Sequence, residues 1–447
     1  MPSIAIVGAG PKAVAIAAKA TVLNRAFPTG GLDVSVYERN DVASAWSGGH
    51  GYTDGLQPLC TLAERDLGFP YSRSTFGKDV AASMFEQFSW HSFAVSSGVG
   101  RAQYEQWVLR GRNPPAHDQF VAYLRSALSV SGTTKHMETV RTISFEPLKS
   151  QWQVESDDRS GSSFIRHFDG VVITGSGPAQ TAIPPGTPNP RIFDGITFWD
   201  NRDKVVHILD ADPQGDRKAV IVGAGGTGAA VAHWFVNHRP DIPLRILGRE
   251  ATLYARHPGY FEDRLFSEED DWALLSADSR REFVRRLTVG VVWDYVLQNL
   301  NRADIEYVCA QVSEFRTLTP PLPGLESEVV AKTHEPIPRT STWSGPLNDE
   351  TGSVFIDARG FNRWAFVDFL DPSLRTTFAA PDQVEKHIDR YLAVTAPPGH
   401  APFPPNFHAP MAASLQGPGA SNLMSLGWMA DRVLSRYMPA GVVTSPR

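Results

Sequence analysis

Cysteine is scarce in this sequence, and its scarcity excludes several kinds of chemistry. Only Cys60 and Cys309 occur among 447 residues, and neither belongs to a C-x-x-C pair. Two isolated thiols cannot build a disulfide framework, so the sequence favours a reducing compartment and disfavours redox-active disulfide chemistry. The histidines show no metal-ligand spacing such as H-E-x-x-H, which argues against a metal site.

The sequence also lacks a membrane-spanning run and an excess of basic residues. An apolar, alanine-rich stretch runs from Ile4 to Ala20, but it has no basic leader and contains a glycine turn, which favours a strand and a helix over a secretion signal. No other segment approaches the apolar length of a membrane span. The net charge of −6, without a dense basic tract, argues against nucleic acid as the main partner. We therefore expect a cytoplasmic protein with no integral membrane segment.

Two glycine-rich turns stand out in what the sequence contains. Each follows a short β-branched run, Ile4–Val7 or Val220–Val222, and opens a helical stretch, which is the context of a dinucleotide-binding motif. Glycine lets the backbone approach a pyrophosphate closely, and the amides at the helix start hold its charge. The motif residues are Gly8, Gly10, Pro11, Lys12 and Ala13 in the first turn and Gly223, Gly225, Gly226, Thr227 and Gly228 in the second.

The residues at the ribose positions assign a different nucleotide to each turn. After the first turn, the next strand-like run leads to Glu38 and Arg39, and the Glu38 carboxylate suits both hydroxyls of a ribose without a 2′-phosphate. After the second turn, the corresponding run leads to Arg249, and a cation there favours a 2′-phosphate. We therefore predict FAD at the first turn and NADPH at the second, with Arg256 as a further candidate for the 2′-phosphate.

These signals predict an α/β fold with two Rossmann-like dinucleotide-binding domains, the second inserted in the first. A chain of 447 residues is long enough for two or three domains. We expect the first part of the FAD domain over 1–178 and the NADPH domain over 210–350, with a helical substrate-binding insertion at about 260–300. Residues 351–447 are expected to return to the FAD domain and the substrate site, so that both nucleotide clefts face a shared interface.

Several longer motifs carry a family resemblance over nearly the whole chain. They are GAGPKAVAIAAKATVL, GYTDG, ERDLGFPY, RGRNPPAH, ITGSG, FWD, YFEDRLFSEEDDWALL and GPGASNLMSLGWMADRVL. The sequence resembles the class B flavin-dependent monooxygenases that hydroxylate amines, and most closely the L-lysine N6-hydroxylases of mycobactin- and nocobactin-type siderophore pathways.

The resemblance implies a defined chemistry. NADPH reduces FAD, the reduced flavin forms a hydroperoxide at its C4a atom with O2, and the distal oxygen is transferred to the N6 amine of L-lysine or of a lysine-containing precursor. The product prepares a hydroxamate iron ligand for a siderophore. Because an ammonium cannot attack, the site must favour the neutral amine, which desolvation achieves. The resemblance also implies a homo-oligomer.

Site residues are carried over from the family position by position. Trp46 falls near the flavin ring, with core packing as the alternative. Gln57 falls on a position that contacts flavin and substrate. Arg65 is the candidate for the substrate carboxylate, with a surface ion pair to a neighbouring acid as the alternative. Asp263 stands where the family has an asparagine and could bind the substrate α-ammonium.

Near the C-terminal end, a segment before a helix resembles the family's flavin and substrate segment. Asn422 and Leu423 are assigned to FAD and Ser425 to the substrate, with a helix cap as the alternative for Ser425. A second family asparagine falls on Val289, which lacks a polar group. Incomplete substrate contacts predict that NADPH consumption exceeds hydroxylysine formation.

Three functional interpretations stay open from the sequence. The first is lysine N6-hydroxylation. The second keeps the flavin chemistry with ornithine or another amine, whereas oxygen insertion into a ketone is disfavoured because Phe193–Trp199 lacks the histidine of the F-x-G-x-x-x-H motif. The third is a largely uncoupled NADPH oxidase or a non-catalytic flavoprotein that senses redox state.

Overall fold

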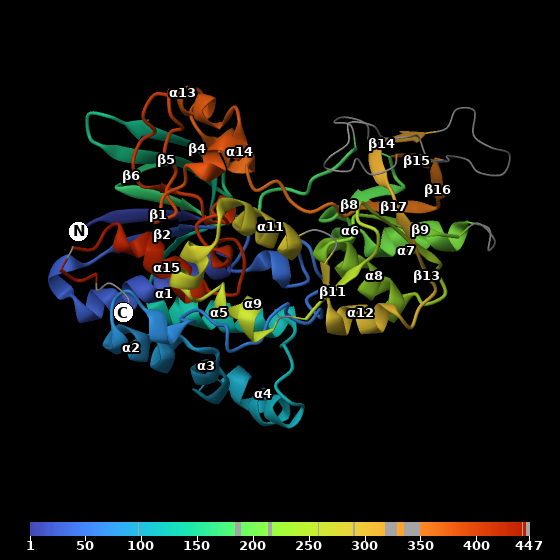
Figure 1. Cartoon of the computed structure of the whole chain (residues 1–447), viewed down its shortest axis with the longest axis horizontal. Helices are drawn as coiled ribbons and strands as arrows, with labels where there is room; N and C mark the ends of the chain where they lie inside the picture. Colours follow the sequence, from blue (N-terminus) through green and yellow to red (C-terminus); the bar gives the residue numbers. More distant parts are fainter. Residues whose placement is uncertain are drawn as a thin grey trace.

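Two α/β halves lie side by side in the structure, a computed structural model (Figure 1). It describes residues 1–96, 98–183, 189–212, 217–257, 259–288, 291–317, 329–334, 349–439 and 441–443. Within these ranges, none of the helices combines the length and apolar character that crossing a bilayer demands.

The first half is built on a parallel sheet with the strand order β18-β7-β1-β2-β3. Its central strands are apolar runs because both faces are buried, as in β1, where Ile4 and Ile6 are fully buried. Helices α1, α5 and α15 lie below the sheet in Figure 1, and an antiparallel meander lies above it. The strands are β1 (Ser3–Val7), β2 (Asp33–Tyr37), β3 (Thr134–His136), β7 (Gly170–Ile173) and β18 (Phe407–His408), and the meander is β4 (Glu138–Glu146), β5 (Gln151–Asp158) and β6 (Ser163–Phe168).

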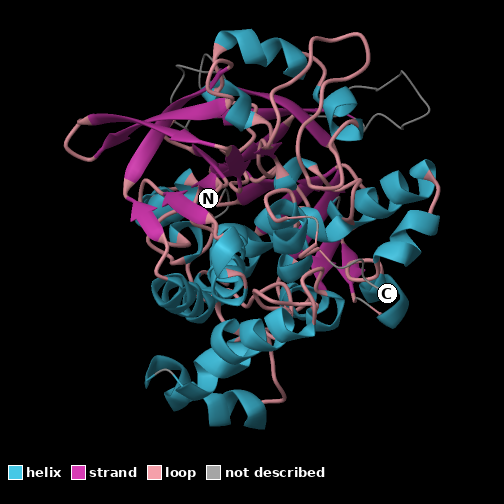
Figure 2. Cartoon of the chain, turned by 90° about the vertical axis from the view of Figure 1, so that its left-hand side faces the viewer, coloured by secondary structure: helices cyan, strands magenta, loops and turns pink. Residues whose placement is uncertain are grey.

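Helices α1 (Pro11–Ala26), α5 (His117–Ser131) and α15 (Leu426–Ser435) bring the two ends of the chain together. Lys19 of α1 and Asp431 of α15 form a buried ion pair at 2.7 Å. Helices α2 (Lys78–Phe88), α3 (Trp90–Ser96) and α4 (Gly98–Leu109) continue downward, and the turned view shows helices projecting below the strand layer (Figure 2). Short helices α13 (Pro372–Arg375) and α14 (Pro381–Lys386) lie at the top of Figure 1. The C-terminal segment therefore completes the first half.

The second half has a parallel sheet with the order β13-β10-β9-β17-β8. One face packs on helices through residues such as Ile221 and Ile246, and the other packs on a small antiparallel sheet through residues such as Val220, Phe315 and Phe355. The parallel strands are β8 (Ile192–Asp194), β9 (Ala219–Val222), β10 (Leu244–Gly248), β13 (Ile305–Cys309) and β17 (Val354–Asp357). The small sheet is β14 (Gln311–Thr317), β15 (Val329–His334) and β16 (Glu350–Gly352), and the helices are α6 (Thr197–Asp200), α7 (Arg202–Ala211), α8 (Gly226–His238) and α12 (Asp294–Leu300).

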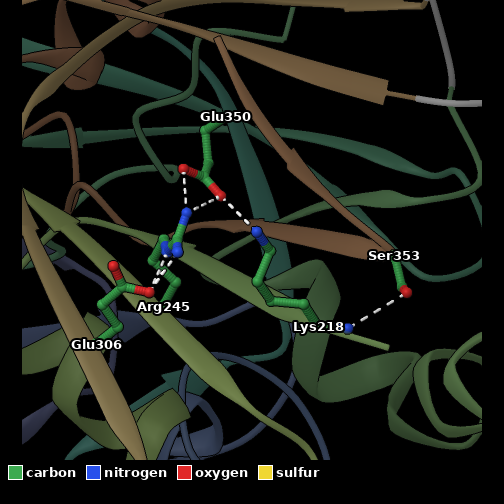
Figure 3. A network of polar contacts seen from close by, with 5 residues as sticks. All are labelled: Lys218, Arg245, Glu306, Glu350 and Ser353. Atoms are coloured by element: carbon green, nitrogen blue, oxygen red, sulfur yellow. Dashed lines mark hydrogen bonds and ion pairs between the residues drawn. The ribbon is translucent and has the colours of Figure 1, made fainter. Parts of the chain in front are cut away.

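A network of charges fastens the small sheet to the second parallel sheet (Figure 3). Glu350 of β16 accepts from Lys218 Nζ at 2.7 Å and from Arg245 Nη1 at 2.7 Å. Arg245 Nε also donates to Glu306 of β13 at 2.8 Å. Lys218, Arg245 and Glu306 lie at or near the starts of their strands, so this network is at the edge opposite the glycine turns.

An insertion between the two halves links them physically. It consists of β11 (Tyr254–Arg256), α9 (Tyr260–Arg264), α10 (Glu269–Leu274), α11 (Ala277–Thr288) and β12 (Val291–Trp293), with β11 paired to β12. Figure 1 shows α9 and α11 in the middle of the molecule. Helices α9, α10 and α11 lie within the range 260–300 where we expect a helical insertion, and strand β12 lies in the same range.

The boundaries of the second half differ from those expected from the sequence. Strand β8 at 192–194 and strand β17 at 354–357 both pair into the second sheet, although both lie outside 210–350. The second half therefore begins before residue 192 and ends after residue 357. Both strands are short and pair with segments distant in the chain, so no local pattern marks their sheet.

Two connecting segments between the halves pair with each other. Ala179 forms an antiparallel bridge with Phe361, and the Gln180 amide donates to Gly360 O at 2.8 Å. The Asn362 amide donates to Pro178 O at 2.9 Å. The halves are thus joined by a short two-stranded ribbon instead of two independent linkers.

Candidate functional site

The first glycine turn leaves open space in front of the start of α1. Gly8 adopts φ +95°, a conformation that favours glycine, and a Cβ there would lie 3.1 Å from Thr174 Oγ1. A Cβ on Gly10 would meet no protein atom within 4 Å. Pro11 occupies the first helical position and Ala13 is fully buried. The first-turn amides of α1 therefore face a space that an anionic group can enter.

Glu38 is held beside this turn at the end of β2. Its Oε2 accepts from the Ala9 amide at 3.0 Å, and its Oε1 accepts from the Asn40 amide at 2.9 Å. Arg39 is exposed next to it. The carboxylate predicted to bind ribose hydroxyls thus lies in contact with the glycine turn.

Lys12 is buried between the first glycine turn and the C-terminal segment. Its Nζ donates to Asn422 O at 2.8 Å, which joins two positions assigned to FAD from opposite ends of the sequence. Burial lowers the pKa of Lys12 to about 7, and the nearby Cys60 thiol has a smaller opposing effect. Asn422 also braces its own loop by accepting from the Met424 amide, and Leu423 is nearly buried. A bound phosphate would supply the negative charge that favours the Lys12 ammonium.

The second glycine turn has a backbone conformation similar to that of the first. Gly223 adopts φ +116°, and a Cβ on Gly228 would lie 2.0 Å from Gly223 O, so the third glycine is required here. A Cβ on Gly226 would meet no atom within 4 Å. Gly225 forms the N-cap of α8, followed by Thr227 in its first turn.

Arg249 projects from the end of β10, the ribose position of the second turn. Its side chain is exposed and has no ion-pair partner in the described part of the chain. A hydrogen bond stabilises the turn that carries Arg249, because Tyr307 Oη donates to Glu250 O at 2.7 Å. Arg249 is therefore free to contact a ligand anion.

Trp46 and Gln57 lie on one loop that contacts the second half. Trp46 stacks on His117 with ring centroids 5.0 Å apart, and His117 Nδ1 lies 3.0 Å from Thr53 Oγ1. Burial lowers the pKa of His117 to about 4, so this ring is neutral at physiological pH. The buried Gln57 donates from Nε2 to Ala230 O of α8 at 3.2 Å. Gln57 therefore bridges the two halves.

The structure brings Arg65 and Asp263, the two residues assigned to the substrate headgroup, into direct contact. Arg65 Nη2 lies 2.8 Å from Asp263 Oδ2, with the side chains 13% and 29% exposed. Arg65 Nη1 also donates to Met424 O at 3.4 Å. Burial lowers the pKa of Arg65 from its ordinary value, and the Asp263 carboxylate opposes that shift. The ion pair to a neighbouring acid that the sequence left open is not the one formed.

Arg256 lies in the same region, and its guanidinium contacts other residues of the insertion. Its Nη2 donates to Glu262 Oε1 at 2.7 Å. Its guanidinium carbon lies 5.6 Å from the Phe266 ring centroid and 5.3 Å from that of Trp293. Because its charge is paired and stacked, Arg256 does not have the free cation that Arg249 offers.

Ser425 also contacts the insertion. Its hydroxyl donates to Phe266 O, and no side-chain cap bond forms at the start of α15, so the helix-cap alternative does not hold. Ser425 is fully buried. Val289, the other family position, lies outside the described residues.

Sequence reasoning missed Asp66, which shapes the loop that carries Arg65. Asp66 is buried and accepts from Tyr71 Oη at 2.6 Å, from the Trp90 amide at 2.8 Å and from the Gly68 amide at 3.2 Å. Burial raises the pKa of Asp66 to about 6 against these hydrogen bonds. Its place directly after Arg65 in ERDLGFPY was the available signal. Within the described ranges, no three His, Cys, Asp or Glu side chains gather closely enough to hold a metal ion.

Comparison with known proteins gives consistent relatives. No protein-family model matches the chain. The L-lysine N6-monooxygenase MbtG of Mycolicibacterium paratuberculosis is 31% identical over 97% of this chain and 95% of its own length. The lysine monooxygenase NbtG of Nocardia farcinica is 28% identical, with a TM-score of 0.77 over 97% of this chain and 100% of that one. The reduced ornithine hydroxylase PvdA of Pseudomonas aeruginosa, at 15% identity and a TM-score of 0.70 over 98% of both chains, shares the fold.

The match covers 97% of this chain and 95% of the mycobacterial relative. The mycobacterial relative matches nearly the full length of both chains, so the two turns, the insertion and the C-terminal segment are all covered. The chain therefore belongs to the L-lysine N6-monooxygenase family.

Proposed function

We propose that the protein is an FAD- and NADPH-dependent monooxygenase that hydroxylates the N6 amine of L-lysine. The product would supply a hydroxamate iron ligand for a siderophore of mycobactin or nocobactin type. The observation that carries the proposal is a pair of glycine-rich turns with opposite charges at their ribose positions, Glu38 at the first and Arg249 at the second, in a chain of this family.

FAD fits the first turn by charge and by space. The open backbone at Gly10 would receive the pyrophosphate on the first-turn amides of α1, with Gly8, Pro11 and Ala13 fixing the turn. Glu38 would accept from the ribose hydroxyls. When bound, FAD reduced by NADPH activates O2 and supplies the oxygen atom that the amine accepts. The residues that would flank it are Lys12, Arg39, Trp46, Gln57, Asn422 and Leu423.

NADPH fits the second turn. Gly223, Gly225, Gly226, Thr227 and Gly228 shape the start of α8, and the exposed Arg249 would pair with the 2′-phosphate. Arg256 is paired with Glu262 and stacked on two rings, so the phosphate would bind Arg249 alone.

L-Lysine would bind with its headgroup at Arg65 and Asp263. The guanidinium would hold the substrate carboxylate, and the Asp263 carboxylate would hold the α-ammonium. Ser425 would border this region, because its hydroxyl donates to Phe266 O of the insertion, and Gln57 is also assigned to the substrate. Desolvation beside aromatic side chains such as Trp46 would favour the neutral N6 amine that attacks oxygen.

The deciding experiment measures oxygen use and product together. The holoenzyme is supplied with NADPH with and without L-lysine, oxygen consumption is followed, and the amino acid is analysed by mass. We expect lysine to gain one oxygen atom. A gain on ornithine or another amine instead would change the substrate, whereas NADPH binding without oxygen consumption would favour a sensor. Arg249→Gln is the control variant. It should weaken NADPH binding without changing the residues assigned to lysine.

The cytosol would provide the reducing conditions that suit Cys60 and Cys309. We also propose a homo-oligomer, which size-exclusion chromatography with light scattering would detect.

A further inference from the structure

A short segment of the first half, residues 57–59, contacts both halves and is called the bridging segment below. Its contacts within the first half are made by the backbone. The His117 amide, at the start of α5, donates to Gln57 O at 2.9 Å, and the Leu59 amide donates to Pro115 O at 2.7 Å. The bridging segment is therefore fixed to the residues around the start of α5.

Two helices of the second half also bind the bridging segment. Tyr295 of α12 donates its hydroxyl to Leu59 O at 2.8 Å, and the same hydroxyl lies 3.1 Å from Pro58 O. Pro58 has no amide proton, so its backbone can be held only through its carbonyl oxygen. Gln57 Nε2 donates to Ala230 O of α8 at 3.2 Å. Each of these contacts joins one half to the other.

Tyr295 is suited to this position because its hydroxyl keeps its proton. Burial raises the pKa of Tyr295 above its ordinary value, and the nearby Cys60 thiol adds to the shift. A protonated hydroxyl is a permanent donor to carbonyl oxygens. Because Leu59 is fully buried, loss of the donor to its carbonyl oxygen would be costly.

Helices α8 and α12, which provide these contacts, pack against each other and carry the second glycine turn (Figure 1). Asn299 Nδ2 of α12 lies 3.0 Å from His233 Nδ1 of α8. Gly226 begins α8, and Ala230 follows it by about one helical turn. The contacts to the bridging segment therefore come from the pair of helices whose first turn is assigned to the coenzyme.

We infer that Tyr295 is a positioning residue that couples coenzyme binding to L-lysine binding. Coenzyme at the second glycine turn restrains α8 and α12, and Tyr295 passes that restraint to the bridging segment and to the loop that continues from it to Arg65. Less conformational entropy is then lost when L-lysine binds, so the coenzyme raises the affinity for L-lysine. L-Lysine raises the affinity for the coenzyme by the same factor. This inference rests on the proposed function, because it assumes these two ligands.

Calorimetry on the FAD-bound enzyme tests the coupling. L-Lysine is titrated with and without saturating NADP+, which occupies the coenzyme site without reducing the flavin. In the wild type we expect NADP+ to strengthen L-lysine binding about fivefold. Tyr295→Phe removes only the hydroxyl and should reduce this factor to about one, with FAD still bound. A wild-type factor of one or below, or an unchanged factor in Tyr295→Phe, would overturn the inference.

Tyr437→Phe is the matched control. Tyr437 is also a partly buried tyrosine, but its hydroxyl lies 2.8 Å from His408 Nε2, within the first half. This variant should keep the wild-type factor of about fivefold. Loss of the factor in both variants would be a general effect of removing a hydroxyl and would overturn the assignment to Tyr295.

Hydrogen exchange on the wild type follows the bridging segment directly and covers a folding failure of Tyr295→Phe. NADP+ should slow exchange of the Leu59 amide, because α8 and α12 then hold the segment more firmly. The amide of Val154, in the meander of the first half, should exchange at an unchanged rate. Equal exchange at Leu59 with and without NADP+ would also overturn the inference.

The outcomes keep the coupling separate from the proposed function. If hydroxylated lysine forms but L-lysine binds equally well with and without NADP+, the coupling alone is wrong. If the wild type binds L-lysine under neither condition and forms no hydroxylated lysine, the proposed function is wrong, and the coupling fails with it.

Discussion

Two clusters of paired charges in this molecule differ in how completely their atoms are satisfied. In the second half, Glu350 binds both Lys218 and Arg245, and Arg245 also binds Glu306 (Figure 3). All these residues belong to a single half. The cluster around α9 also has two arginines and two carboxylates, but it joins the first half to the insertion and contains two buried atoms without a hydrogen-bond partner among the described residues.

We propose that the first cluster is structural and that the second binds the substrate. The Glu350 network lies at the strand edge away from the glycine turns, where its bonds fasten one sheet to another. The Arg65 and Asp263 pair lies where the insertion meets the loop of the first half and the C-terminal segment. A buried polar atom without a partner is costly, and a bound ligand would supply the partner that Asp263 Oδ1 lacks among the described residues.

The largest expected effect is a loss of affinity for L-lysine when Arg65 is substituted. Arg65→Gln should raise the KM for L-lysine about a hundredfold, because the charged hydrogen bonds to the substrate carboxylate are lost. NADPH oxidation without lysine should change little. Steady-state kinetics check this, and a KM within about threefold of the wild-type value would remove Arg65 from the substrate site.

Substitutions in the Glu350 network should lower the free energy of unfolding and leave the affinity for L-lysine unchanged. Glu350→Gln leaves Lys218 and Arg245 without their shared carboxylate and should lower the free energy of unfolding by about 2 kcal/mol. Denaturant unfolding measures this. Glu306→Gln is the control, since its carboxylate is 58% exposed and should cost below about 1 kcal/mol. A raised lysine KM in Glu350→Gln would contradict the distinction between the clusters.

The free cation at the second turn gives a smaller and more selective effect. Arg249→Gln should raise the KM for NADPH about tenfold, because one charged contact to the 2′-phosphate is lost, and should leave NADH almost unaffected. Comparison of the two coenzymes checks it. Equal losses for both coenzymes would place the 2′-phosphate elsewhere.

Lys12 is buried and has no acidic partner among the described residues. Burial lowers its pKa from 10.5 to about 7, whereas a bound pyrophosphate would favour the ammonium. FAD binding should therefore take up a proton above about pH 7, and FAD affinity should fall by up to about tenfold per pH unit as the pH rises. Fluorescence titration of the apoprotein measures it.

The lowered pKa of Lys12 also determines how the stability of the apoprotein changes with pH. The unfolded chain keeps the Lys12 proton up to about pH 10.5, but the folded apoprotein loses it at about 7, so this group makes unfolding less favourable as the pH rises through that window. Lys12→Met should abolish both dependences. If the affinity of the wild-type apoprotein for FAD does not depend on pH, Lys12 does not contact FAD.

The sequence predicts those parts of the molecule whose cause is local. Gly8 and Gly223 each require positive φ within a strand, turn and helix, and both turns form as expected. The start of β5 alternates polar and apolar residues, Gln151, Trp152, Gln153 and Val154, which is a local signal for a strand of the meander.

Contacts between segments distant in the chain cannot be predicted from local sequence patterns. Arg65 and Asp263 were each singled out as substrate residues, but the contact between them depends on how the insertion docks on the first half. Arg256 was assigned to the coenzyme, although Glu262 lies only six residues further along and captures its charge. Strands β8 and β17 were misplaced because strand pairing across the chain has no local pattern.

The most direct test is a crystal structure of the FAD-bound enzyme with L-lysine. We expect the lysine carboxylate on Arg65 and the α-ammonium on Asp263, with the nitrogen and oxygen atoms of that former ion pair separated beyond about 4 Å. The bonds from Glu350 to Lys218 and Arg245 should be unchanged. L-Lysine bound elsewhere, with Arg65 still paired to Asp263, would contradict the account.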